Sequence, residues 1–236
     1  MTTKRQGFNQ VASGLAALAI LLLARSASAN TITFATGDFT PAEWSSNIWP
    51  GSTGTSTAFT EATGGNPGAY RRVSLTVDVF QSVLNSQLWS VAQFTPAAQG
   101  SVSSASLSYD ITRVFTDDPG ATQVVAGVSL EQDGVIYFQF IGISTASPPT
   151  WDPIAVANLV PLFPAINWVN GNAITFGFYD SVSSSTEGFT IDGGYDNYAV
   201  TVNYTPLTST VPEPASLLLV ASGLVGLARM KHRRSR

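Results

Sequence analysis

The sequence predicts an all-β fold: an antiparallel β-sandwich of jelly-roll type with one short helix. Two observations carry this prediction. Along most of the chain, apolar residues alternate with polar ones at a period of two, which is typical of strands with one buried face. Clusters of Gly, Ser, Thr and Pro separate these segments at roughly regular spacing, as turns do. Many short strands of this kind favour two antiparallel sheets packed on each other.

The strands follow from the alternation. In segment 72–80, Val73, Leu75, Val77 and Val79 share one face and polar residues share the other. In segment 101–115 the shared apolar face holds Ala105, Leu107, Tyr109 and Ile111. The same pattern occurs in segments 172–182 and 198–204.

A hairpin and a helix complete the predicted elements. Segment 123–143 contains two alternating apolar runs joined by Asp133-Gly134, the residue types that a two-residue turn with positive φ requires. The short helix is expected from Asp152, as N-cap, to Pro161, as stop, with a proline at its first helical position. We expect residues 30–205 to form the single sandwich domain.

The N-terminal residues 1–29 have the features of a secretory signal peptide. Two basic residues precede the apolar stretch 11–24, and Ala27 and Ala29 provide the small residues of a cleavage site after Ala29. A retained membrane anchor is the alternative. The sequence therefore predicts export, with a mature chain that begins near Asn30.

Charge and composition exclude several function classes for the mature body. Residues 30–210 hold three arginines, no lysine and fourteen carboxylates, a net charge of −11 that repels nucleic acid and anionic lipid. The chain has no cysteine, and its one histidine, His232, lies in the C-terminal tail. Disulfides, histidine-based catalysis and the usual zinc sites are therefore not expected in the body.

The C-terminal segment 212–236 follows a linker at 206–211 and consists of three parts. Pro212-Glu213-Pro214 precedes an apolar helix predicted at 215–228, and a basic tail occupies 229–236. Fourteen helical residues reach only about 21 Å, so the segment is a marginal membrane anchor. Its basic end should stay on the cytoplasmic side, with the body outside.

This three-part segment resembles the PEP-CTERM sorting signal of Gram-negative bacteria. The resemblance implies that Pro212, Glu213 and Pro214 form a processing site for exosortase, a membrane protease or transpeptidase. It also implies a transient inner-membrane anchor, followed by release to the cell surface or an exopolysaccharide (biofilm) matrix. A simple C-terminal anchor with a proline-containing linker is the alternative reading.

The body is similar to a second family, the laminin IV type A or laminin B class of jelly-roll modules. The similarity rests on "GGNPGAY" (64–70), "FTPAAQGSVSSASLSYDI" (94–111) and the segment 174–202. Modules of this class are extracellular, often adhesive, and generally not enzymes. The resemblance therefore implies a structural or adhesive role.

Calcium is the one cofactor for which the body offers candidate ligands, and no other cofactor is expected. Asp192, Asp196 and Asn197 bring oxygen donors and neighbouring glycines to one short segment, as calcium requires. The alternative is that these residues are ordinary turn formers.

Four tryptophans are candidates for stacking on sugar rings: Trp44, Trp49, Trp151 and Trp168. Core packing explains tryptophans at least as well. A glycoside hydrolase would need a carboxylate pair from Glu43, Glu61, Glu131 or Glu187, but their spacing selects none. We therefore expect a non-enzymatic surface or matrix protein, structural or adhesive in an exopolysaccharide context. A carbohydrate-binding module is the alternative, and a glycosidase is a third hypothesis.

Overall fold

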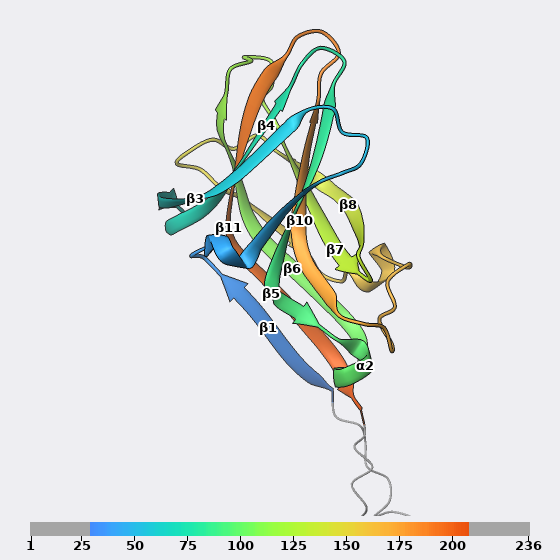
Figure 1. Ribbon diagram of the computed structural model, residues 1–236. Helices are drawn as coiled ribbons and strands as arrows, with labels where there is room; N and C mark the ends of the chain where they lie inside the picture. The colour runs from blue at the N-terminus through green and yellow to red at the C-terminus, as the bar shows by residue number, and fades with distance from the viewer. Residues whose placement is uncertain (1–28, 208–236) are drawn as a thin grey trace, which may run out of the picture. The chain divides into compact units, whose positions relative to one another are not determined.

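The computed structural model describes residues 29–207, which form two antiparallel sheets packed face to face (Figure 1). Sheet A has the order β3-β4-β11-β6-β9, with β1 also paired to β11, and sheet B has the order β2-β5-β10-β7-β8. The strands of sheet A are β1 (Asn30–Thr36), β3 (Thr55–Gly65), β4 (Gly68–Val77), β6 (Gly100–Thr116), β9 (Asp152–Val156) and β11 (Phe189–Pro206). Those of sheet B are β2 (Trp44–Ile48), β5 (Ser82–Phe94), β7 (Val124–Gln132), β8 (Val135–Ser144) and β10 (Ile174–Ser183). The predicted antiparallel all-β sandwich is confirmed.

The strands bury the faces that the alternation indicates. In β6 the apolar set Ala105, Leu107, Tyr109 and Ile111 is buried, and in β4 the predicted face is buried as far as Val77. The predicted hairpin is the β7–β8 pair, whose turn residues Asp133 and Gly134 have φ values of 57° and 75°. Positive φ at both central turn positions is what the Asp-Gly signal implies.

The position predicted for the helix is wrong. Asp152 begins strand β9, which pairs with β6, and only a 3-10 turn, η2 (Val160–Leu162), follows it. Because β9 lies at the edge of sheet A, Pro153 is tolerated in it. The short α-helix is α2 (Pro96–Gln99), which also has a proline at its first helical position, after Thr95. A second 3-10 turn, η1 (Pro41–Glu43), precedes β2.

The core between the sheets is rich in aromatic side chains. Phe178 of sheet B stacks on Tyr195 of sheet A with ring centroids 4.1 Å apart, and Trp44 stacks on Trp89 at 5.8 Å. Tyr198 packs edge-on against both tryptophans. Burial of each large apolar side chain contributes about 1.5–3 kcal/mol, so this cluster holds the two sheets together without disulfides.

Both ends of the sandwich segment lie at the same end of the molecule, next to α2 (Figure 1). Asn30 at the start of β1 pairs with Tyr204 near the end of β11. All the described strands and core residues lie between residues 30 and 206, so this segment holds the elements that it needs to fold alone.

The predicted end segments lie almost entirely outside the described residues. These are the signal peptide, of which only Ala29 is described, the motif Pro212-Glu213-Pro214, the apolar helix 215–228 and the basic tail 229–236. Within residues 29–207, no helix has both the length and the apolar character needed to cross a membrane.

Candidate functional site

The outer face of sheet B carries the candidate site. In β10, Phe178 and Asp180 point into the core, so Tyr179 and Ser181 point outward. The register places Leu84 of β5 opposite Ser181, and Gly127 of β7 opposite Tyr179. The same alternation that builds the core therefore also builds an outward row of side chains across three central strands.

Trp49 and Phe138 meet above this face. Their ring centroids are 4.9 Å apart with an interplanar angle of 80°, and Phe138 lies 5.4 Å from Tyr179. Trp49 follows β2 at one edge of sheet B, whereas Phe138 belongs to β8 at the other edge. Because rings from opposite edges touch, the outer face is concave. Both rings remain more than one-third exposed, at 38% for Trp49 and 37% for Phe138.

Trp49 is held in place by the backbone. Its N–H donates to the Leu84 carbonyl at 2.9 Å, and its own carbonyl accepts from the Ser52 N–H at 3.0 Å. The Ser52 hydroxyl oxygen in turn accepts from the Leu84 N–H at 3.1 Å. The loop that carries the indole is therefore fastened to β5, which orients the ring before any ligand arrives.

Tyr179 forms the floor under the two exposed rings. A Cβ atom at Gly127 would lie 2.0 Å from Cε1 of Tyr179, so only glycine lets this ring lie against β7. Tyr179 is 4% exposed, and burial raises the pKa of its phenol to about 12. The hydroxyl therefore stays neutral at physiological pH.

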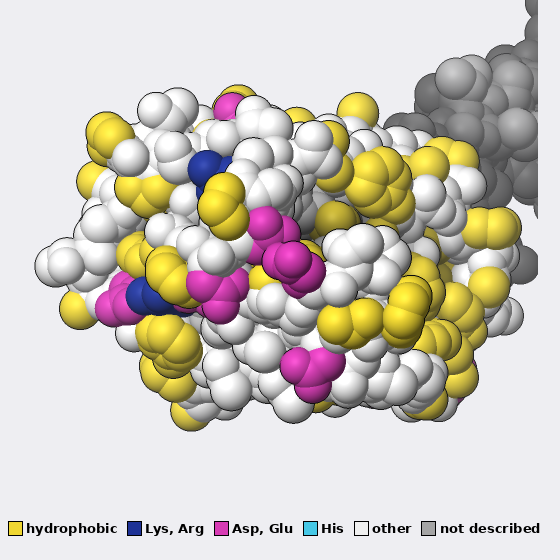
Figure 2. Space-filling model, turned by 90° about the horizontal axis from the view of Figure 1, so that it is seen from above, with side chains coloured by type: hydrophobic (Ala, Val, Ile, Leu, Met, Phe, Trp, Pro, Cys, Tyr) yellow, Lys and Arg dark blue, Asp and Glu magenta, His cyan; other side chains and the backbone are white. Residues whose placement is uncertain are grey.

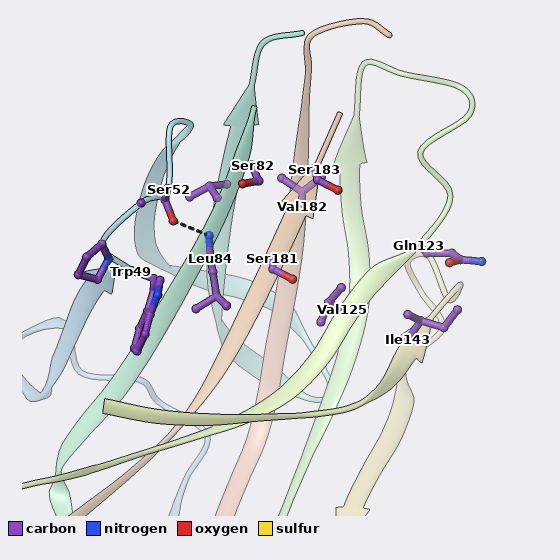
Figure 3. A pocket seen from close by; sticks show the side chains of 13 residues that line it. Trp49, Ser52, Ser82, Leu84, Gln123, Val125, Ile143, Ser181, Val182 and Ser183 are labelled. Atoms are coloured by element: carbon purple, nitrogen blue, oxygen red, sulfur yellow. Dashed lines mark hydrogen bonds between the residues drawn. The ribbon is translucent and has the colours of Figure 1, made fainter. Parts of the chain in front are cut away.

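A groove of about 560 Å³ opens beside the rings, at the end of the sandwich opposite the two termini. Figure 3 shows Trp49 on one side, Gln123 and Ile143 on the other, and the side chains of Leu84 and Ser181 between them. No charged side chain lines it. Its polar side chains are four hydroxyls and one amide: Ser52, Ser82, Ser181, Ser183 and Gln123. Viewed from above, hydrophobic side chains and other uncharged atoms cover most of the surface, with several acidic and some basic side chains among them (Figure 2).

Such a surface suits an uncharged ring that has apolar faces and many hydroxyls. Aromatic rings can stack on those faces, while serine hydroxyls and an amide exchange hydrogen bonds with the ligand. The lining holds no carboxylate, histidine or cysteine that could act as a general acid, base or nucleophile. The arrangement is therefore suited to binding.

The structure separates the four candidate tryptophans. Trp49 alone lines the groove. Trp44 and Trp168 lie in the core, at 7% and 5% exposed. Trp151 lies on the outer face of sheet A, edge-on to Tyr70 at 5.5 Å. Sequence reasoning missed Phe138 and Tyr179, although the predicted hairpin contained the alternation that turns Phe138 outward.

The three candidate calcium ligands do not converge. Asp192 bonds Arg72, whereas Asp196 and Asn197 lie four and five residues further along β11, where Asp196 accepts the Asn66 N–H. Asp196 also accepts the Asn197 N–H at 2.6 Å. Desolvation raises the pKa of Asp196, and these two N–H bonds act in the opposite direction. Among residues 29–207, no group of three or more His, Cys, Asp or Glu side chains is arranged to hold a metal ion.

The four candidate catalytic glutamates lie on separate elements. Glu43 is in η1, where it accepts the Trp89 indole N–H at 3.0 Å, and Glu61 is in β3, where it pairs with Arg72. The other two lie in β7 and in the loop before β11: Glu131 and Glu187. None of the four lines the groove.

Comparisons with known proteins support the sorting signal and give structural neighbours. The sequence model of the PEP-CTERM protein-sorting motif matches residues 210–234, which confirms the predicted motif. No curated protein matches the chain.

Among solved structures, the sandwich is similar to carbohydrate-binding modules of the β-sandwich superfamily. One such structure has a TM-score of 0.45 and 10% identity, covering 72% of this chain and 74% of that one. The family 11 module from Clostridium thermocellum, in complex with a β-1,3-1,4-mixed-linked tetrasaccharide, has a TM-score of 0.39 and 13% identity, covering 71% and 94%. The CBM22-1 xylan-binding domain of Paenibacillus barcinonensis Xyn10C has a TM-score of 0.39 and 9% identity, covering 78% and 100%. The laminin resemblance stays a prediction from the sequence.

Proposed function

We propose that the chain is an exported, non-enzymatic surface or matrix protein that binds carbohydrate through the concave outer face of sheet B. The observation that carries this proposal is the exposed Trp49–Phe138 pair above the buried Tyr179, beside a groove without charged side chains. The proposal unites the two leading hypotheses from the sequence, because a matrix protein that holds a glycan is also adhesive.

Binding would use the two exposed rings as an apolar platform. A pyranose ring stacked on Trp49 would turn its hydroxyls toward Ser181 and the other hydroxyls of the groove. Because the loop of Trp49 is fastened to β5, little loop entropy would be lost on binding. The groove is open at the surface, so the ligand would be a segment of a longer chain.

The preferred ligand would be an uncharged polysaccharide of the surrounding matrix. No positive side chain lines the groove, and a body charge of −11 disfavours acidic polymers at low salt. The groove lies at the end of the sandwich opposite Pro206, after which the chain continues to the sorting motif. A polymer bound in the groove would therefore not cover the end of the sandwich at which Pro206 lies.

The sorting half of the proposal concerns the C-terminal segment. Exosortase processing at Pro212-Glu213-Pro214, after transient anchoring by 215–228 in the inner membrane of a Gram-negative bacterium, would release the sandwich to the cell surface or matrix. The PEP-CTERM match supports this route. The intact mass of the exported protein tests it: loss of the residues after the motif supports processing, and an uncleaved tail at the cell surface contradicts it.

The binding half is tested with residues 30–206 and a matched pair of tryptophan variants. The probes are neutral polysaccharides, including the producing organism's own exopolysaccharide, measured by affinity electrophoresis and calorimetry. We expect Trp49→Ala to weaken binding by about 10–100-fold, or about 1.4–2.8 kcal/mol, because it removes both the apolar area that the indole buries and its stacking contact. Trp151→Ala removes an indole from the other sheet and should leave binding unchanged.

Three results would contradict the binding proposal. They are equal losses in both tryptophan variants, no binding of wild type to any probe, and release of reducing sugar from a bound polysaccharide. Repeating the wild-type measurement with a chelator tests calcium at Asp196 and Asn197, with Asp192 as the third predicted ligand. Chelator-sensitive binding would support calcium, and insensitive binding would remove it from the proposal.

A further inference from the structure

Strand β8 is an exposed edge of sheet B. It pairs with β7 on one side, and none of the strands described between residues 29 and 207 lies on its other side. Apart from this ladder, no backbone–backbone hydrogen bond involves residues 135–143 within the described chain. Only the Phe140 carbonyl has another partner, the Gln139 side-chain amide at 3.2 Å. The outward N–H and C=O groups of β8 are therefore available to another strand.

The sequence of β8 lacks the features that usually protect an edge. Its residues, "VIYFQFIGIS", contain no charge and no proline, and its first six positions combine high β-propensity with the absence of glycine. Four of its side chains are large, apolar and exposed by 37–53%: Val135, Phe138, Phe140 and Ile143. A one-residue irregularity occurs only beyond Phe140, so residues 135–140 form a regular edge.

The other edges of the two sheets differ from β8. In sheet A, β9 carries Asp152 and Pro153, and β3 carries Glu61 and two glycines at its end. In sheet B, β2 has only five residues, of which three are Ser or Asn. Charge, proline and short length are the usual means of preventing edge-to-edge pairing. β8 has none of them, whereas β1, the remaining described edge, also lacks charge and proline but has only seven residues, four of which are Thr or Asn.

Charge indicates which occupant fits this edge. Copies of a body with a charge of −11 repel one another over most of their surfaces, but β8 brings no charge to a contact. A strand that pairs antiparallel with its own copy also satisfies two-fold symmetry, the commonest symmetry of oligomers. We therefore infer that β8 is a self-association edge, at which a second copy pairs through residues 135–140 and joins the two B sheets.

The expected size of this contact makes the association weak. The six-residue segment 135–140 is roughly 20 Å long, and a strip about 10 Å deep along it covers on the order of 200 Å² of each copy. A stable complex buries about 800 Å² per partner. The pairing is thus concentration-dependent, and it would operate where copies are crowded, as on a surface or in a matrix. It does not depend on glycan binding.

Sedimentation velocity of residues 30–206, from micromolar to millimolar concentration, tests this inference. We expect wild type to shift toward dimer as concentration rises. Phe140→Lys places an unpaired charge in the contact, opposite the apolar Val135 of the second copy, and should weaken dimerisation about tenfold. Val135→Glu, at the other end of the regular segment, should act in the same direction. Phe80→Lys is the matched control: this phenylalanine is 82% exposed outside β8, so its variant should dimerise as wild type does.

Hydrogen exchange locates the contact. If β8 is the edge, amide protection in residues 135–143 rises with protein concentration in wild type and stays constant in Phe140→Lys. Circular dichroism establishes that each variant is folded. A wild type that stays monomeric at all concentrations, a folded Phe140→Lys that dimerises normally, or protection that rises elsewhere would each overturn the inference.

Discussion

The two sheets of the sandwich differ in how many charged side chains their strands hold. The strands of sheet A hold eight charged side chains: Glu61, Arg71, Arg72, Asp110, Arg113, Asp152, Asp192 and Asp196. One of them, Arg71, is 3% exposed and points into the core, where it donates to Gln87 of sheet B at 2.8 Å. The strands of sheet B hold two, Glu131 and Asp180, and Asp180 points into the core. The outer face of sheet B is thus nearly uncharged, although the protein as a whole is acidic.

This difference supports the proposal that the two faces have separate roles. A charged outer face keeps an exported protein soluble and resists association. An uncharged face with exposed rings lowers solubility and favours association, so its presence in one sheet indicates a docking surface. Both the proposed glycan groove and the proposed self-association edge belong to sheet B. The predictions below measure how much the charged side chains of sheet A, and the buried carboxylate and packed rings of sheet B, contribute to stability.

The largest effect is expected at Asp180, the buried carboxylate of sheet B. It is 2% exposed, one oxygen accepts the Tyr195 hydroxyl at 2.7 Å, and the other oxygen has no partner. Desolvation raises the pKa of Asp180 to about 7, against an unfolded value of about 3.9. The folded state therefore binds this proton more tightly than the unfolded state does. The stability contributed by Asp180 is complete below about pH 4 and is lost as pH rises to about 7.

The difference amounts to about 1.4 kcal/mol per pH unit, or about 4 kcal/mol over the whole range. Urea unfolding of wild type and Asp180→Asn between these pH values measures it. The free energy of unfolding of the variant should lack this decline, because its amide does not titrate. Parallel pH profiles for the two proteins would show that the pKa of Asp180 is the same in the folded and unfolded states, contrary to this prediction.

The second prediction concerns Tyr179, the floor under the exposed rings. Gly127→Ala would force the Tyr179 ring away from β7 and should lower the free energy of unfolding by about 1–3 kcal/mol. It should also weaken glycan binding, since Phe138 rests against Tyr179. Gly142→Ala on β8 is the control. Nothing lies within 4 Å of its added Cβ, and we expect a change within about 0.5 kcal/mol. Equal effects of the two variants in chemical denaturation would contradict this account of the floor.

Much of the fold could be predicted from the sequence because a period-two pattern is local. Val73 and Leu75 face the core because residues two apart in a strand lie on the same face. Asp133 and Gly134 form the hairpin turn because both residue types tolerate positive φ. The helix was misplaced because a proline after a capping residue is also compatible with an edge strand. Asp152 and Pro153 form such a strand because β6 offers a partner, which is a tertiary effect.

The site was less predictable because it depends on sheet curvature. Trp49 and Phe138 are 89 residues apart in the sequence and meet only because sheet B is concave. Composition could indicate that tryptophans are candidates, but it could not show that Trp44, the first residue of β2, lies in the core while Trp49, just after β2, is exposed. The sequence does not indicate that Tyr179 supports the exposed rings, because its position depends on the absence of a side chain at Gly127 on the next strand.

The smallest effects are expected on sheet A, where one arginine pairs with two carboxylates. Arg72 contacts Asp192, whose side chain is 5% exposed, and also Glu61, whose side chain is 36% exposed, at 3.1 Å. Asp192→Asn weakens the buried contact and should cost about 1–2 kcal/mol of unfolding free energy, with Arg72 itself partly solvated. Glu61→Gln, as the exposed counterpart, should cost less than about 0.5 kcal/mol, and high salt should remove that cost. Chemical denaturation at low and high salt distinguishes the two. If Glu61→Gln proved as costly as Asp192→Asn, the charges of sheet A would be structural, and its contrast with sheet B would no longer identify the docking face.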